Sequence, residues 1–111
     1  MKLAAVRRLA LSLPEVTEAP HFHFGSWRVA GKIFVTIPPG DELLHVFVPD
    51  EVREPALAMY PDFLEKLTWG AKVIGLRVRL PQAAPEVVKR LVRQAWEAKA
   101  PRRLVAAAKP R

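Results

Sequence analysis

The chain contains three histidines whose spacing could support a metal site. His21 and His23 are two residues apart in an alternating segment, so they would share one face of a strand, and His45 could lie on a neighbouring strand. Three imidazoles with one open position are a known arrangement for zinc. Residues 21–23 fall near a surface loop, however. We therefore expect two surface histidines, one histidine on the sheet, and no metal requirement.

Groups for covalent or acid–base catalysis are few. The chain has no cysteine, which excludes disulfides, thiolate metal sites and a cysteine nucleophile. The two serines, Ser12 and Ser26, fall at a helix end and in a turn, outside any Gly-x-Ser-x-Gly elbow. Glu15 and Glu18 lie in a Pro-bounded segment and are expected to be solvated rather than a catalytic pair.

A glycine-rich segment resembles a phosphate-binding loop at first sight. Five residues rather than four separate Gly25 from Gly31-Lys32, and Ile33 stands where a hydroxyl would hold magnesium. The segment also lies between two strand-like runs rather than before a helix. We interpret it as a hairpin, and we expect neither enzymatic activity nor a cofactor.

The elements that would position these residues follow from hydrophobic period and turn signals. Residues 2–13 and 84–99 have helical spacing, and residues 51–60 form a shorter helix. Residues 14–20 are expected to be a loop, and residues 21–48 contain three short strands. Residues 63–67 are a strand or a connection, and residues 72–80 are a strand.

This order of elements predicts the fold class. Strands joined by short turns favour antiparallel pairing. We expect an α+β, two-layer domain over residues 1–101, with an antiparallel sheet of four to six strands and the N- and C-terminal helices packed on one face. Residues 102–111 are expected to be a basic C-terminal tail that is partly ordered.

Charge is distributed unevenly along the 111 residues. Residues 1–65 hold six basic and nine acidic residues, net −3, whereas residues 66–111 hold twelve basic and two acidic ones, net +10. Such asymmetry favours one cationic surface and a polyanionic partner. The alternative is a solvated helix face with a basic tail.

Strand alternation places part of this charge on a sheet face. In residues 76–80 both arginines share one face and the aliphatic residues share the other. If the aliphatic faces meet the helices, cations and aromatic rings alternate on the open face, which is typical of a nucleic-acid surface. The expected residues of this face are Arg28, Lys32, Phe34, His45, Phe47, Arg77 and Arg79.

Further contacts are expected from Lys72, at the start of the basic strand, and from Arg102 and Arg103 in the tail. The open alternative is that Phe34 and Phe47 are covered by a loop, the tail or a second subunit. If Arg28, Lys32, Arg77 and Arg79 each neutralise one phosphate, log K should fall against log salt with a slope of about −3.6 on duplex DNA.

Composition gives weaker indications of origin and location. No apolar run reaches the roughly 18 residues of a membrane-spanning helix, and the apolar stretch after Arg7-Arg8 is too short for an export signal. We expect a cytoplasmic protein. The chain has no asparagine, two glutamines and 11 prolines, a bias that fits a thermophile.

Three segments together resemble a known family. The run Phe24–Phe34 is similar to the Phe-Gly…Phe-x-Val-x-Gly-Lys-x-Phe hairpin of the MmcQ/YjbR family, Leu67-Thr68-Trp69 to its tryptophan-containing segment, and Ala95–Leu104 to the closing Ala-Trp…Lys-x-Pro-Lys/Arg-Arg-Leu of one branch. The Trp69-Gly70 step departs from the pattern, which is polar or longer in many members. The resemblance covers nearly the whole chain.

The resemblance implies a compact α+β domain related to the frataxin-like arrangement and to the "double wing" DNA-binding domain of a phage transcription factor. Members carry a DNA-binding label largely through that structural similarity, and fold does not fix function. We expect a nucleic-acid (DNA) binding domain without catalysis. The alternative is a protein-interaction or small anionic-ligand module that uses the same face.

Overall fold

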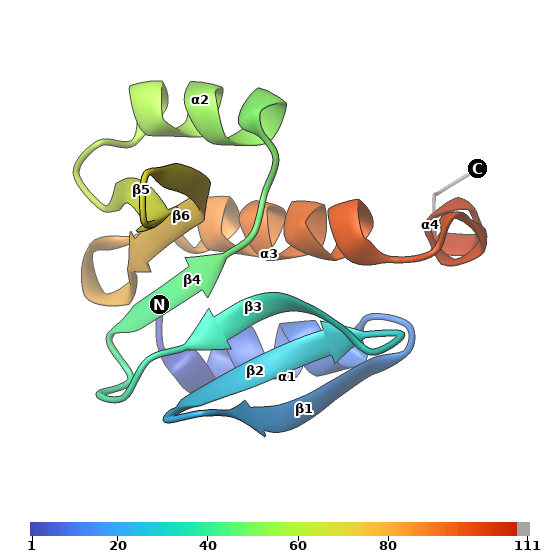
Figure 1. The fold of residues 1–111 in the computed structure, drawn as a ribbon. Coiled ribbons are helices and arrows are strands. Elements are labelled where there is room, and N and C mark those ends of the chain that lie inside the picture. Colours follow the sequence, from blue (N-terminus) through green and yellow to red (C-terminus); the bar gives the residue numbers. More distant parts are fainter. Residues whose placement is uncertain (109–111) are drawn as a thin grey trace.

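The computed structural model describes residues 1–108, in which a six-stranded sheet forms one layer and helices form the other (Figure 1). All neighbouring strands are antiparallel, in the order β1-β2-β3-β4-β6-β5. This arrangement confirms the expected α+β fold class. The strands are β1 (Val16–His21), β2 (Phe24–Val29), β3 (Lys32–Ile37), β4 (Leu43–Val46), β5 (Leu64–Trp69) and β6 (Lys72–Arg79).

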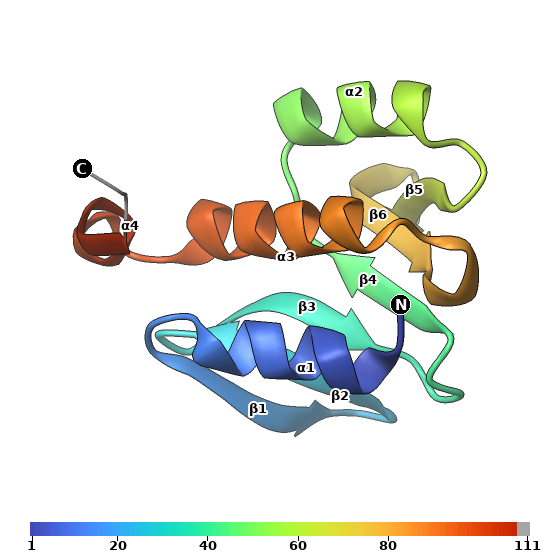
Figure 2. The same cartoon turned by 180° about the vertical axis from the view of Figure 1, so that it is seen from behind.

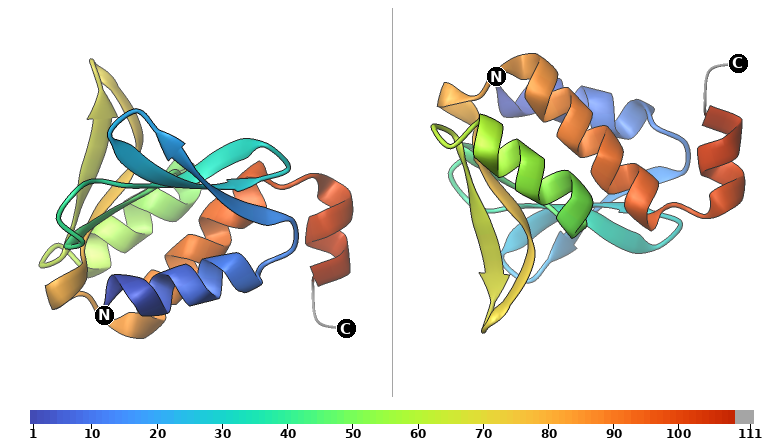
Figure 3. Two further views of the ribbon diagram at one scale, coloured as in Figure 1. Left: turned by 90° about the horizontal axis from the view of Figure 1, so that it is seen from below. Right: turned by 90° about the horizontal axis from the view of Figure 1, so that it is seen from above.

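The helices cover one face of this sheet. Seen from behind, α1 and α3 lie side by side against the sheet, with α2 beside the β5–β6 hairpin (Figure 2). The other face is not covered by a helix, as the views from below and above show (Figure 3). The helices are α1 (Leu3–Ser12), α2 (Asp50–Met59), α3 (Pro85–Lys99) and α4 (Arg102–Ala108), and a 3₁₀ turn, η1 (Leu80–Gln82), precedes α3.

The apolar stripe of each long helix forms the core. Helical spacing brings Val6 and Ala10 of α1, and Val88, Leu91 and Val92 of α3, onto the sheet, and all five are buried. Trp96 also lies in this core, and its indole Nε1 donates to the Pro14 carbonyl at 3.1 Å. This bond ties the end of α3 to the loop after α1.

The expectation of a loop over residues 14–20 is wrong, because β1 begins at Val16. This strand lies at the edge of the sheet and pairs with β2 from Val16↔Val29 to His21↔Phe24. Most of its side chains are at least partly exposed, so it lacks the hydrophobic alternation that identifies an inner strand. Pro20 is tolerated because an edge strand leaves one row of N–H groups unpaired.

The placement of Phe34 on the open face is also wrong. Trp27 pairs with Val35 and Arg28 pairs with Ile33, so Phe34 is the extra residue of a β-bulge. The bulge reverses the alternation within β3: Phe34 is fully buried in the core, and Ile33 lies on the open face beside Arg28. The aromatic ring expected for ligand contact is therefore a core residue.

Two hairpins project on the face of the sheet away from α1 and α3 (Figure 3). One joins β1 to β2 and the other joins β5 to β6. A second bulge, at Leu67/Thr68, bends the β5–β6 hairpin. Gly75 allows β6 to approach β4, because a Cβ at this position would lie 2.2 Å from the Val46 carbonyl oxygen. We call these hairpins the two wings.

The segment after α3 contains a short helix. Residues 102–108 form α4, and Leu104 is buried. Arg103 Nη1 lies 2.9 Å from Glu15 Oε2, which joins α4 to the turn before β1. Residues 109–111 of the expected tail lie outside the described residues. Within residues 1–108, no helix has both the length and the apolar character needed to cross a membrane.

Candidate nucleic-acid interface

A row of polar side chains crosses the open face of the sheet at paired positions. Ser26 pairs with Thr36, Thr36 with His45, and His45 with Arg77. Glu65 of β5 pairs with Arg77 from the other side. Paired residues of neighbouring strands point to the same face, so these five side chains form one line, which we call the polar row.

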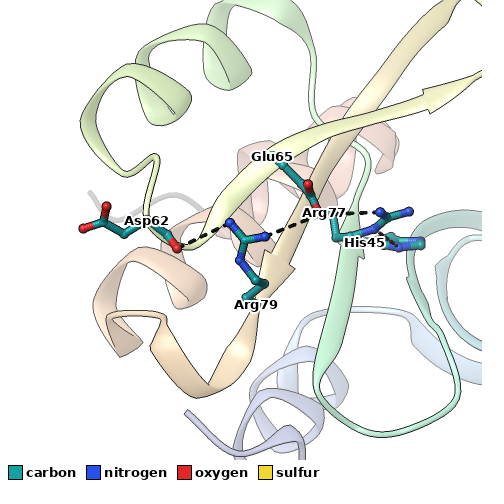
Figure 4. A network of polar contacts seen from close by, with 5 residues as sticks. All are labelled: His45, Asp62, Glu65, Arg77 and Arg79. Carbon is teal, nitrogen blue, oxygen red and sulfur yellow. Dashed lines mark hydrogen bonds and ion pairs between the residues drawn. The ribbon is translucent and has the colours of Figure 1, made fainter.

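Hydrogen bonds connect one end of the polar row (Figure 4). Arg77 Nε donates to His45 Nε2 at 3.1 Å, and His45 Nδ1 lies 3.3 Å from Thr36 Oγ1. An arginine can only donate, so His45 Nε2 must be unprotonated here and Nδ1 carries the proton that Thr36 Oγ1 accepts. The contacts therefore select one neutral tautomer of His45.

Glu65 neutralises part of the charge that the sequence assigned to phosphate binding. Its Oε1 lies 3.5 Å from Arg77 Nη1 and 3.8 Å from Arg79 Nη1. Arg79 Nη2 also donates to the Asp62 carbonyl at 3.5 Å. Both arginines remain about two-fifths exposed, so their outer N–H groups still face solvent.

A groove of about 520 Å³ lies where β3 and β4 diverge. Only Val35↔Val46 and Thr36↔His45 pair these strands directly, and the Phe47 N–H then bonds the Phe34 carbonyl at 3.1 Å. Both wings, the start of α2 and the end of α3 contribute to its walls. The lining residues are His21, Ile33, Thr36, Phe47, Val48, Pro49, Asp50, Arg53, Lys72, Val73, Ile74, Ala98 and Lys99.

Three cations and a histidine, from four elements, line this groove. They are His21 of β1, Arg53 of α2, Lys72 of β6 and Lys99 of α3. Asp50 is the one carboxylate in the lining, and it lies 2.9 Å from Arg53 Nη2. Among residues 1–108, neither Lys72 nor Lys99 forms an ion pair. The groove therefore combines unneutralised positive charge with apolar lining residues that include Ile33 and Phe47.

The structure brings some of the expected contact residues together and separates others. Phe47 and Lys72 line the groove, and Arg77 lies in the polar row with Arg79 beside it. Arg28 is on the same open face, where its Nε donates to Ser26 Oγ at 3.2 Å.

The remaining expected residues lie elsewhere. Lys32 is exposed at the start of β3, and Phe34 is in the core. Arg102 and Arg103 are exposed on α4, where Arg103 is paired with Glu15, and neither lines the groove.

Sequence reasoning misses three of the basic residues of the groove as ligand contacts. The sequence presents His21 only as a candidate metal ligand, and Arg53 and Lys99 belong to helices that helical periodicity does not bring together. Helical period shows that Lys99 ends α3, but only the packing of α3 on the sheet brings it into one lining with Ile33 near the start of β3. The sequence also gives no signal for Phe22, which occupies a wing tip and is 90% exposed.

The three histidines do not form a metal cluster. Both ring nitrogens of His45 are engaged, and no group of three or more potential ligands among His, Asp and Glu lies together in residues 1–108. The expectation that folding needs no metal stays a prediction, which melting with and without a chelator would check.

Comparison with known proteins gives the family. A model of the YjbR family matches residues 11–98, more than half of the chain. The chain belongs to the YjbR family. The resemblance to MmcQ/YjbR proteins in its hairpin and tryptophan segments is thereby confirmed. In this YjbR chain the match includes both wings, the polar row and every groove residue except Lys99.

A solved structure resembles the fold of this YjbR chain. The crystal structure of Deinococcus radiodurans protein DR2400, described with a DUF419 domain, superposes with a TM-score of 0.74. The two chains share 17% identity, and the alignment covers 86% of this chain and 75% of the other. At that identity the similarity concerns the fold. No curated protein matches the chain.

Proposed function

We propose that this YjbR family member binds nucleic acid in the groove between its wings. The observation that supports this most is the convergence of Lys72 and Lys99, from two separate elements, on one groove whose lining carries a single carboxylate, already paired with Arg53. Unneutralised cations on a concave surface attract phosphates and release counterions. The proposal assigns no catalytic step and no cofactor.

The polar row extends the proposed contact surface across the sheet. Arg77, Arg79 and Arg28 present partly exposed guanidinium groups on the face that the helices leave open. Because phosphate contacts carry no base code, the proposed binding depends little on sequence. The proposal also includes a cytoplasmic location and, from composition, a thermophilic origin.

Charge reversal in the groove tests the proposal. In Lys72→Glu/Lys99→Glu, we expect affinity for a fluorescent DNA duplex or single strand to fall by at least about tenfold at low salt, since each lost phosphate contact also adds repulsion. A matched control is Lys89→Glu/Arg93→Glu, which makes the same charge change on the exposed side of α3. Equal losses in both variants would show that net charge, not the groove, controls binding.

A second candidate is a small anionic ligand in the same groove. Its volume of about 520 Å³ falls within the range of small-molecule pockets, and it contains both cations and apolar surface. A mononucleotide or a dicarboxylate that raises the melting temperature, while polymeric DNA adds nothing, would favour this candidate.

A further inference from the structure

We infer that the two wing tips clamp single-stranded nucleic acid by stacking its bases on Phe22 and Trp69. This inference rests on the proposed function and adds the class of nucleic acid and the residues that recognise it. The side chain of Phe22 is 90% exposed and that of Trp69 is 79% exposed. The other two tryptophans, Trp27 and Trp96, are buried.

The backbone conformation at the tip of the first wing, the β1–β2 hairpin, disfavours an aromatic residue, and yet Phe22 occupies it. Both wings end in two-residue turns, between the paired residues His21↔Phe24 and Trp69↔Lys72. In each turn the first central residue has a positive φ, 58° at Phe22 and 61° at Gly70. Glycine is the usual residue at this position, as in the second wing. Phe22 is therefore strained as well as exposed.

The two tips border the same groove. Both hairpins lie on the side of the sheet away from α1 and α3 (Figure 3). His21, adjacent to Phe22, and Lys72, paired with Trp69, both line the groove. A strand lying in the groove would have its phosphates near Lys72 and Lys99, with an exposed ring at each wing.

Single-stranded nucleic acid fits this arrangement better than the alternatives. Stacking needs bases whose faces are free, and in a duplex those faces are already stacked on one another. A protein partner would be expected to meet an apolar surface of larger extent, whereas here two separate rings flank a cationic groove. Rings combined with cations are the usual means of binding single strands without sequence preference.

Tryptophan emission provides a direct test, because Trp69 is the exposed one of the three tryptophans. Oligothymidylate of about 12 nucleotides, within the site size of small single-strand binding domains, serves as the probe. We expect it to quench the emission that iodide also quenches. A duplex of equal length should leave this emission nearly unchanged.

Variants connect the signal to binding, with affinity measured by anisotropy of dye-labelled oligothymidylate. Trp69→Ala and Phe22→Gly should each weaken binding by at least about tenfold, the usual effect of losing one stacked base. Trp69→Phe keeps a ring and should retain most of the affinity. Phe22→Gly relieves the strained turn, so its loss of binding would not come from unfolding. Met59→Ala, which removes an exposed apolar side chain on α2, should change nothing.

The outcomes separate the two proposals. Binding of oligothymidylate without quenching, and with unchanged affinity in Trp69→Ala and Phe22→Gly, would overturn the stacking inference and leave nucleic-acid binding intact. Equal quenching by the duplex would overturn the preference for single strands. Absence of binding to either probe would overturn both proposals, and the exposed rings of Phe22 and Trp69 would then be assigned to contact with a protein partner.

Discussion

His45 shows how the surroundings of one residue fix its charge. Burial and, to a smaller extent, the positive charge of Arg77 together lower the pKa of His45 to about 4, although the negative charge of Glu65 opposes the shift. Protonation would place an Nε2–H against the Arg77 Nε–H donor at 3.1 Å. The polar row therefore holds a neutral histidine at physiological pH, and its positive charge comes from arginine.

This lowered pKa predicts an acid-dependent loss of stability. Below about pH 6.5 the unfolded His45 protonates, while the folded residue stays neutral until about pH 4. The stabilising contribution is complete above 6.5 and is lost as pH falls towards 4, at no more than about 1.4 kcal/mol per pH unit. Urea denaturation between about pH 7 and 5 should show this slope in the wild type and a smaller one in His45→Gln. His23→Gln, at an exposed histidine, should keep the wild-type slope.

Glu65 provides a second test at the residue scale. If Arg77 and Arg79 contact phosphates, Glu65→Gln should release both from their ion pairs and strengthen DNA binding by about 2–5-fold, since exposed pairs contribute under about 1 kcal/mol. Glu86→Gln on the exposed side of α3 makes the same charge change and should have little effect in an anisotropy titration. Unchanged affinity in Glu65→Gln would remove both arginines from the contact surface.

Arg77 also contributes to the stability of the fold, although it is partly exposed. Two exposed cations on a sheet would contribute little to folding. Arg77 instead satisfies His45 Nε2, so Arg77→Ala leaves a buried acceptor without a partner. Its cost should approach about 1–3 kcal/mol.

At the scale of elements, Gly75 determines how the second wing leaves the sheet. A Cβ there would meet the Val46 carbonyl oxygen at 2.2 Å, and backbone cannot move aside as a flexible side chain can. Gly75→Ala should destabilise the protein by about 1–3 kcal/mol in urea denaturation. Gly25→Ala is the matched control and should cost less than about 1 kcal/mol, because its Cβ would meet only the Ile37 side chain, with Cδ1 at 3.3 Å and Cβ at 3.7 Å. Equal effects would contradict this account of the wing.

Helices and inner strands could be predicted where one face is buried. The apolar stripes of α1 and α3 come from a 3.6-residue period that their packing requires, and the two arginines of β6 share a face as expected. The edge strand β1 could not be predicted, because exposure removes its pattern. The bulge at Phe34 has no glycine to mark it, and one extra residue moved that ring from the open face to the core.

The first wing could not be predicted from the sequence, for a related reason. His21-Phe22-His23-Phe24 has the alternation of a continuous strand, and neither glycine nor asparagine marks the turn between His21 and Phe24. The alternation therefore predicts Phe22 inside a strand, whereas it lies in the turn with a positive φ that is unusual for an aromatic residue. The basic residues of the groove could not be grouped from the sequence, because four separate elements contribute them.

At the scale of the whole molecule, the basic half of the sequence does not form one surface. Lys72 and Lys99 line the groove, whereas Lys89, Arg90 and Arg93 lie on the exposed side of α3. Arg102 and Arg103 lie on α4. Of the cations on α3, only Lys99 at its end lines the groove, and the others lie on the side of the helix that faces away from the sheet. The basic half of the sequence is therefore not one basic surface of the folded protein.

The salt dependence of binding tests the central claim, that phosphates occupy the groove and the open face, most directly. Three cations on this side, Arg28, Lys72 and Lys99, form no ion pair within residues 1–108. If each neutralises one phosphate of a single strand, log K for oligothymidylate should fall against log salt with a slope of about −2.1. A slope near zero, or no binding at low salt, would contradict the account.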